Sequence, residues 1–356
     1  MPPIPRRALL AVPLAAPLAA LLAAPWATEP AAAQPVAAQP VAAQSSSIWP
    51  DRPLRLVVPY PAGSTPDVTG RAIAQHLGQV LGQPCVVDNR PGAGGNIGTD
   101  AVAKATDGHT IGVSINGPLS TAPALFPGLP YDPARDLAPI SLLVRGAQLL
   151  VVHPAVPAAD LAEFLALVRA NPGRFSFGSV GSGSGGHLAM LDMLARAAGD
   201  GAAPGLATEA MLHVPYRGFP PAVLDLVAGR IDAMVLIAAG ILPQLRAGQV
   251  RALAVTAEAR IPQAPEVPTL AEAGIADAAS YAWNGLVGPA GLPADRVARL
   301  AAEAQRALAA PETRRMLEAA GFEVVASGPE DLRRHMAEEA GRWGGLIARL
   351  GIKAEA

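Results

Sequence analysis

Short apolar segments alternate with amphipathic segments along the chain from about residue 50 onward. The segments 54–59, 85–88 and 110–115 have the length and the β-branched content of buried strands. The stretch 68–81 and a second stretch from 98 to about 104 lie between them and have the spacing of helices. Strands that are separated by helices predict parallel pairing in βαβ units, which is typical of an α/β fold.

The middle of the chain repeats this alternation and could close a sheet by itself. We predict strands at 149–153, 175–178, 231–237 and 252–256, with helices at 158–170, 187–198, 222–228 and 242–247. A last strand at 282–287 precedes three helices, at 294–309, 311–320 and 329–350. These helices have strand partners only in the first section, so we predict that the chain crosses back. Lobe 1 would comprise residues 48–145 and 263–356, and lobe 2 residues 146–262.

The first 47 residues have the pattern of an exported protein. Arg6 and Arg7 precede an apolar run that Pro13 and Pro17 interrupt, and small residues follow it. We interpret residues 1–33 as an export signal peptide, which directs the mature protein to the periplasm of a Gram-negative type cell. A transmembrane anchor is the alternative, but the run is short for a span. Residues 34–47 are a low-complexity tether rich in Ala, Pro and Gln.

The charge balance and the cysteine content exclude several classes of function. The chain has 27 Lys and Arg against 29 Asp and Glu, so nothing favours nucleic acid or an anionic membrane surface as a partner. Cys85 is the only cysteine, which excludes an intramolecular disulfide and a thiolate metal cluster. The six histidines are scattered without metal-ligand spacing, so we expect no metal and no cofactor.

Two loops have the composition of anion sites. In the first, residues 59–67, a Pro/Gly turn leads from a strand into a helix that Ser64 or Thr65 can cap. In the second, residues 178–187, serines and glycines again connect a strand to a helix. The unpaired N–H groups and the dipole of a helix N-terminus attract an anion, and hydroxyls can donate to a carboxylate. Ordinary helix caps are the alternative interpretation of both loops.

The position of these loops in the predicted sheet favours a common cleft. Ligands of α/β sheets bind outside the carboxyl ends of the strands, where the first loop, residues 89–98 and Asn116 would converge.

Two residues of the loops have two possible roles each. Asp67 either pairs with the helix dipole or orders waters and recognises an ammonium group. His187 either donates to a ligand or has a capping or packing role.

No pattern for catalysis accompanies the two loops. None of the loop serines has the Gly-x-Ser-x-Gly surroundings of a hydrolase nucleophile. The glycines of residues 92–98 are spaced one residue too widely for a dinucleotide fingerprint. We therefore predict no catalytic residues and no enzyme activity.

Several motifs together resemble the tripartite tricarboxylate transporter receptors, the Bug-type periplasmic solute-binding proteins. The resemblance covers essentially all of residues 48–355, and its motifs are residues 49–55, 58–67, 88–98, 129–133, 213–218, 251–256 and 267–274. It implies a two-lobed, type II Venus-flytrap fold with a parallel-dominated sheet in each lobe. It also implies that a ligand carboxylate lies between the loops 62–67 and 179–187, partly through bridging waters.

Residues and resemblance together define the candidate ligand-binding set. The set comprises Tyr60, Ala62, Gly63, Ser64, Thr65, Asp67, Asn116, Ser179, Gly181, Ser182, Ser184, Gly185, His187 and Tyr216. One departure concerns the ligand: many relatives carry a polar residue, often Asp, where this chain has only apolar residues at 234–239. We therefore expect a more apolar distal pocket and an aliphatic or aromatic carboxylate in preference to aspartate or glutamate.

The predicted function is capture of a small carboxylate in the periplasm for uptake by the membrane subunits of a tripartite tricarboxylate-type transporter. The mature protein would not itself be embedded in the membrane. A sensor that presents its ligand-bound form to a signalling partner is one alternative. An exported α/β enzyme that acts on a carboxylated substrate is the other.

Overall fold

A computed structural model describes residues 49–199, 205–319 and 321–354, and the statements below concern these residues. The chain divides into a unit of residues 1–46 and a unit of residues 47–356, and the fold described here belongs to the second. The predicted signal peptide and tether therefore lie outside the described residues.

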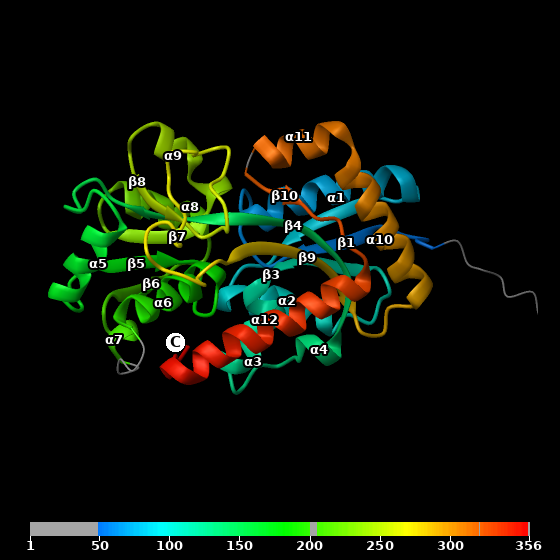
Figure 1. Ribbon diagram of the computed structural model, residues 1–356. Coiled ribbons are helices and arrows are strands. Elements are labelled where there is room, and N and C mark those ends of the chain that lie inside the picture. The colour runs from blue at the N-terminus through cyan, green and yellow to red at the C-terminus, as the bar shows by residue number, and fades with distance from the viewer. Residues whose placement is uncertain (1–48, 200–204, 320, 355–356) are drawn as a thin grey trace, which may run out of the picture. The chain divides into compact units, whose positions relative to one another are not determined.

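A mixed sheet of ten strands forms the centre of the fold (Figure 1). The strands along its main path follow the order β2 (Cys85–Asn89), β1 (Leu54–Val58), β3 (Thr110–Ile115), β9 (Tyr281–Pro289), β4 (Leu137–Val152), β7 (Ala233–Ile237), β5 (Ser176–Ser179) and β6 (Leu212–Pro215). The strands β8 (Arg251–Val255) and β10 (Glu323–Val324) pair with β4 off this path. Parallel pairs occur at both ends: β1 with β2 and β3, and β5 with β6 and β7. The predicted α/β fold is confirmed.

The long strand β4 connects the two sections of the sheet. From Leu137 to Ala147 it pairs with β9, and from Gln148 to Val152 it pairs with β7. The sequence pattern predicts a strand only at 149–153, so the rest of β4 is a difference from the prediction. The missed part is buried on both faces and contains Pro139 and two register shifts, so it has neither the alternation nor the regularity of a simple strand.

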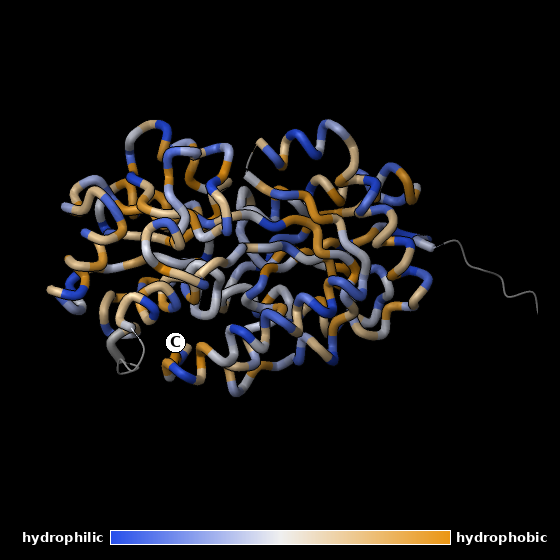
Figure 2. The backbone as a smooth tube through the Cα atoms, viewed as in Figure 1, coloured by the Kyte–Doolittle hydropathy of each residue, from blue (hydrophilic) through white to orange (hydrophobic). Residues whose placement is uncertain are grey.

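Helices cover the sheet as their apolar spacing predicts. Those of the first and last sections are α1 (Thr65–Leu81), α2 (Asn96–Ala103), α3 (Ala122–Leu125), α4 (Pro133–Asp136), α10 (Ala294–Ala309), α11 (Pro311–Ala319) and α12 (Pro329–Leu350). Those of the middle section are α5 (Leu161–Ala170), α6 (Gly185–Ala198), α7 (Gly205–Thr208), α8 (Phe219–Val227) and α9 (Leu242–Arg246). In α1, for example, Ile73, Leu77 and Leu81 share a buried face. Apolar and polar residues alternate along α12 in the same way (Figure 2).

Short irregular helices complete the connections at the ends of the strands. These are η1 (Ala93–Gly95), η2 (Gly117–Thr121), which has π-helical bonding, and η3 (Ala238–Gly240).

The predicted return of the chain to its first section is observed. The strand β9 pairs with β3. In the helices, Oε2 of Glu303 in α10 lies 3.1 Å from Nε2 of His76 in α1. The helix α12 packs against both sections. Its residue Leu332 shares a core cluster with Val57, whereas Trp343 shares a cluster with Phe177.

Helix α6 lies so close to β7 that one of its positions requires glycine. A Cβ atom on Gly186 would lie 2.0 Å from the backbone oxygen of Val235, which is far inside van der Waals contact. Because the neighbouring atom belongs to the backbone of a central strand, neither partner can move aside cheaply. The first turn of α6 is thereby held against the sheet.

We expect Gly186→Ala to lower the free energy of unfolding by about 3 kcal/mol or more, because it overpacks this contact. The matched control is Gly341→Ala on the exposed face of α12, where a Cβ atom would meet nothing within 4 Å. The control should raise stability by about 0.5–1 kcal/mol through helix propensity. Urea unfolding of the two variants checks this, and equal stabilities would contradict the inferred contact.

Candidate functional site

The loops that follow the parallel strands of the two sections meet each other. A Cβ atom on Gly181, in the loop after β5, would lie 2.9 Å from the Cα atom of Gly94 in η1. The Thr121 hydroxyl donates to the backbone oxygen of Gly183 at 2.8 Å. Parallel strands present their carboxyl ends at one edge of a sheet, so the loops after β1 and β3 lie at this edge as well.

Two buried serines occupy equivalent positions at the starts of long helices. Ser64 precedes α1 and Ser184 precedes α6, with nearly the same backbone angles: φ −72° and ψ 161° against φ −65° and ψ 157°. Both are N-cap residues, yet neither side chain makes the usual bond to its own helix. Their hydroxyl oxygens are enclosed and have no hydrogen-bond partner in the structure. Each hydroxyl therefore remains available to a ligand.

Two side-chain amides lie at the start of α6. A Cβ atom on Gly185 would lie 2.7 Å from Nδ2 of Asn116 and 2.8 Å from Oε1 of Gln148. Asn116 follows β3, and Gln148 lies within β4. Both residues are 1% exposed, and the NH2 group of each has no partner. Buried polar groups are nearly always hydrogen-bonded, so the unpartnered donors of Asn116, Gln148 and Ser184 make the start of α6 a candidate binding site for acceptors.

Asp67 organises the first loop with its own carboxylate. It accepts hydrogen bonds from the backbone N–H of Gly63 at 2.9 Å, from Asn89 at 2.9 Å and from Arg71 at 3.0 Å. Burial raises the pKa of Asp67, but the hydrogen bonds from Arg71, Asn89 and Gly63 outweigh this effect and leave the pKa below its ordinary value. Both oxygens are occupied, which favours a structural role over the recognition of an ammonium group.

Tyr60 holds the first loop against η1. Its hydroxyl donates to the backbone oxygen of Gly94 at 2.5 Å, and burial raises the pKa of this phenol. Ala62 and Gly63 are exposed, and Thr65 is half-buried in the first turn of α1.

A stack of three rings supports the second loop. The rings of His187 and His213 lie 4.1 Å apart between centroids, and Phe177 stacks on His213 at 4.9 Å. Nδ1 of His187 accepts a hydrogen bond from the N–H of Gly183 at 3.0 Å. The Ser179 hydroxyl lies 2.7 Å from Nε2 of His213. His187 and Ser179 are thus engaged in shaping the loop, in agreement with the packing alternative for His187.

The remaining predicted residues frame the second loop. Gly181 and Gly183 have φ values of 119° and 80°, which only glycine adopts readily, and Ser182 lies between them. The Tyr216 hydroxyl donates to Asp225 at 2.8 Å, and burial together with this carboxylate raises the pKa of Tyr216 to about 12. Its hydroxyl is therefore also engaged within the protein.

For an anion, the loops of the candidate site offer no cationic side chain. The sequence has no Lys or Arg at residues 60–65, 116–121 or 179–187. The favourable potential must come from the N-terminal ends of α1 and α6, which have 17 and 14 residues, and from neutral donors. Among the described residues, no three His, Cys, Asp or Glu side chains gather closely enough to hold a metal ion.

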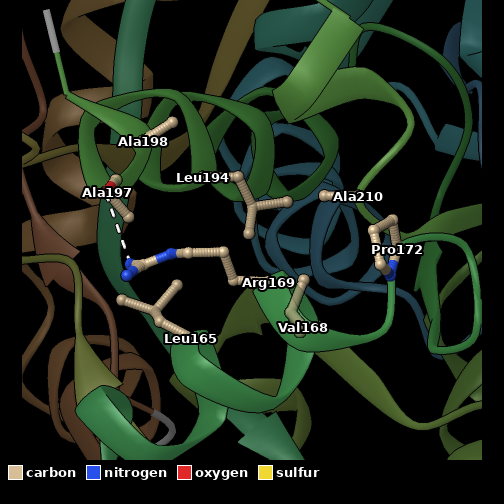
Figure 3. Close-up of a pocket in the computed structure, with 8 residues that line it drawn as sticks. All are labelled: Leu165, Val168, Arg169, Pro172, Leu194, Ala197, Ala198 and Ala210. Carbon is tan, nitrogen blue, oxygen red and sulfur yellow. Dashed lines mark hydrogen bonds between the residues drawn. The ribbon is translucent and has the colours of Figure 1, made fainter. Parts of the chain in front are cut away.

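Of two cavities in the structure, one is lined by predicted site residues and the other is not. One of about 340 Å³ lies beside the first loop, where Gly63, Ser64 and Thr65 face Phe219 of α8 and Gln244 of α9. The other, of about 330 Å³, lies between α5 and α6 and is lined mainly by aliphatic side chains (Figure 3). There Arg169 donates to the backbone oxygen of Ala197. No predicted site residue lines this second cavity.

Comparison with known proteins identifies the family. The profile described as "Tripartite tricarboxylate transporter family receptor" matches residues 69–352. The chain belongs to this family. A UPF0065 protein from the tcbD-tcbE intergenic region of Pseudomonas sp. strain P51 is 40% identical over 308 residues, which is 86% of this chain and 88% of that protein. BugT of Bordetella pertussis is 35% identical over 311 residues, or 87% and 92% of the two chains.

Solved structures of the same kind share the fold. MatC from Rhodopseudomonas palustris with bound malate has 33% identity and a TM-score of 0.77, with 84% of this chain and 100% of that chain covered. A second R. palustris protein, determined with adipate, has 31% identity and a TM-score of 0.78, with coverages of 86% and 99%. The two-lobed receptor fold inferred from the sequence is confirmed. Along the described chain, no helix has both the length and the apolar character needed to cross a membrane.

The candidate set predicted from the sequence of this tricarboxylate transporter receptor does not include Gln148. The residue lies in a part of β4 that was not predicted as a strand, so its place at the meeting point of the loops could not be foreseen. A signal was nevertheless present: Gln148 is the one polar residue in the run from 146 to 152. A polar residue in a strand that is buried on both faces requires a partner or a ligand.

We expect the stability of the receptor to fall as the pH decreases from about 7 to about 4. Burial lowers the pKa of His213 to about 4, and burial together with the neighbouring His213 lowers that of His187 well below 6.5. Between these values the unfolded chain binds more protons than the folded chain, so acid favours unfolding. His335 also has a lowered pKa and contributes in the same direction.

Urea unfolding at pH 7.5 and pH 5 should show a loss of roughly 1–3 kcal/mol. The lowered pKa of Asp67 affects stability only below about pH 4, so it does not contribute in this window. The variant His213→Gln should reduce the loss. An unchanged loss in this variant would show that His213 does not titrate as inferred.

Proposed function

We propose that this receptor captures a small carboxylate between the loops at residues 62–67 and 179–187. The single observation that carries the proposal is the pair of N-cap serines, Ser64 and Ser184, whose enclosed hydroxyls cap neither helix and have no partner. A carboxylate has two oxygens that can accept from such donors, and the helix dipoles favour its charge. The malate and adipate bound to the two R. palustris proteins belong to the same chemical class.

The ligand-binding set in this proposal has two groups. Residues that supply donors to the ligand are Ser64, Asn116 and Ser184, with backbone N–H groups at Thr65 and Gly185. Residues that position these donors are Tyr60, Asp67, Ser179, His187 and Tyr216, because their polar groups bind within the protein. Ala62, Gly63, Gly181 and Ser182 form the loop backbone. We also propose that the part of the pocket farther from the carboxylate is apolar, as the apolar residues at 234–239 predict.

The proposed lobes meet along β4. Lobe 1 contains residues 48–145 and the C-terminal section, and lobe 2 begins at 146, beside the point where β4 changes partners between Ala147 and Gln148. We propose that the chain returns to lobe 1 at about residue 280 and not at 262/263. The reason is that Thr269 forms a parallel bridge with Val255 of β8, and the N–H of Ser280 donates to the backbone oxygen of Thr256 at 2.9 Å.

The proposed cellular role is delivery of the carboxylate to the membrane subunits of a tripartite tricarboxylate transporter from the periplasm. The family assignment supports this role, and so does the predicted export signal. Receptors of this kind bind and release their ligand unchanged. Recovery of the ligand in unaltered form after incubation would separate this role from that of an enzyme.

We expect at least one acid in a thermal-shift panel of mono-, di- and tricarboxylates, amino acids and aromatic acids to stabilise the receptor. A ligand at about 100 times its dissociation constant should add roughly 2.7 kcal/mol to the free energy of unfolding. Ser64→Ala and Ser184→Ala should each weaken that ligand about 10- to 100-fold, as expected for a lost hydrogen bond to a charged group. The matched control is Ser141→Ala, a buried serine of β4 outside both loops. Wild-type affinity in both loop variants would contradict the proposed site.

We expect Asp67→Asn to lower the affinity for every ligand of the receptor by a similar factor, because it loosens the loop that carries Ser64. It should also lower the free energy of unfolding by about 1–3 kcal/mol, since the carboxylate accepts from three donors. Calorimetric titration with a carboxylate and an amino acid checks this. A loss confined to amino acids would instead assign Asp67 to ammonium recognition.

A further inference from the structure

We propose that Gln148 determines specificity by donating its side-chain amide to a second hydrogen-bond acceptor on the ligand. The inference rests on the proposed function, because it adds a second contact to the site that holds the carboxylate. The ligand would be a carboxylic acid that bears a second acceptor group, such as another carboxylate, a hydroxyl or a carbonyl.

The fold does not require the amide of Gln148. The backbone N–H of Gln148 donates to the Thr256 hydroxyl at 3.1 Å, and its backbone oxygen accepts from the N–H of Thr256 at 2.8 Å. These bonds connect β4 to β8 with no contribution from the side chain. A methionine of similar length would pack in a buried strand without leaving an unpaired polar group.

The amide nevertheless lies where a ligand would be enclosed. Gln148 is the first residue of β4 to pair with β7, at the change from one section of the sheet to the other. Its side chain reaches the first turn of α6, because a Cβ atom on Gly185 would touch its Oε1 atom at 2.8 Å. Asn116 approaches the same point from the end of β3, so glycine at 185 is what allows the two amides to approach the backbone of the helix so closely.

The chemistry of the amide selects the type of second group. Nε2 of Gln148 and Nδ2 of Asn116 are both buried without partners, so the site presents N–H donors that require an acceptor. The carboxylate of Asp67 accepts from Gly63, Arg71 and Asn89, so it is not free to pair with an ammonium group on the ligand. A ligand with an acceptor at this point gains hydrogen bonds, and a ligand with a methyl group there leaves the amide unpaired.

Matched acids test this discrimination in the full receptor. The probes are succinate against butyrate and adipate against hexanoate, which differ only in the second carboxylate. Gln148→Met should weaken the dicarboxylates about 10- to 100-fold and change the monocarboxylates less than about threefold. Gln148→Glu should weaken the dicarboxylates further, because it replaces the donors by a negative charge. Equal losses for both members of a pair would overturn the proposal.

A ligand-free measurement tests Gln148 independently of the probes. Because Gln148→Met removes an unpaired buried polar group, it should raise the melting temperature by about 2–4 °C. The matched control is Asn284→Leu: Asn284 is equally buried, but its amide donates to the Thr69 hydroxyl at 3.1 Å, so this variant should melt lower. A lower melting temperature for Gln148→Met would overturn the proposal.

A wild-type receptor that binds none of the four acids would count against the proposed function, and the melting comparison would still decide the role of Gln148.

Discussion

Close approach of backbone to backbone is the constraint on which the site depends. The loop after β5 meets η1, which follows β2, at Gly181 against Gly94, and α6 meets β7 at Gly186 against Val235; a side chain would collide at either position. Interiors pack as tightly as organic crystals, so these contacts hold the first turn of α6 in place. A helix end that is held in this way can attract an anion through its N–H groups without a lysine or an arginine.

The polar side chains of the site divide into two sets with different energetic roles. Asp67, His187 and Tyr216 bind within the protein, and their hydrogen bonds determine where the loops lie. Ser64 and Ser184 leave their hydroxyls enclosed without partners. An unpaired buried group costs about 1–3 kcal/mol, so the second set destabilises the empty receptor and favours any ligand that supplies acceptors. In the proposed site, stability of the fold would thus be exchanged for affinity.

The long strand β4 relates this site to the fold as a whole. It is the element that passes from the β9 side of the sheet to the β7 side, and α12 follows it from the cluster of Val57 to the cluster of Phe177. A ligand that binds beside Gln148 therefore contacts the structure at the point where its two sections join. Movement of one section relative to the other would change the distances to all donors together.

The sequence by itself determined most of the elements and the composition of the two loops, and tertiary structure decided what the residues in them do. The alternation of strands and helices depends on local spacing, and the helix starts at α1 and α6 depend on the serines that precede them. Both features can be read directly from the sequence. The roles of Asp67 and His187 stayed open because they depend on Asn89 and on His213, which are distant in the chain. Gln148 was missed for the same reason: its apolar neighbours show that the amide needs a partner or a ligand, but they do not show which of the two it has. Satisfaction of a buried polar group is a property of the whole packed fold, so only the tertiary structure could reveal it.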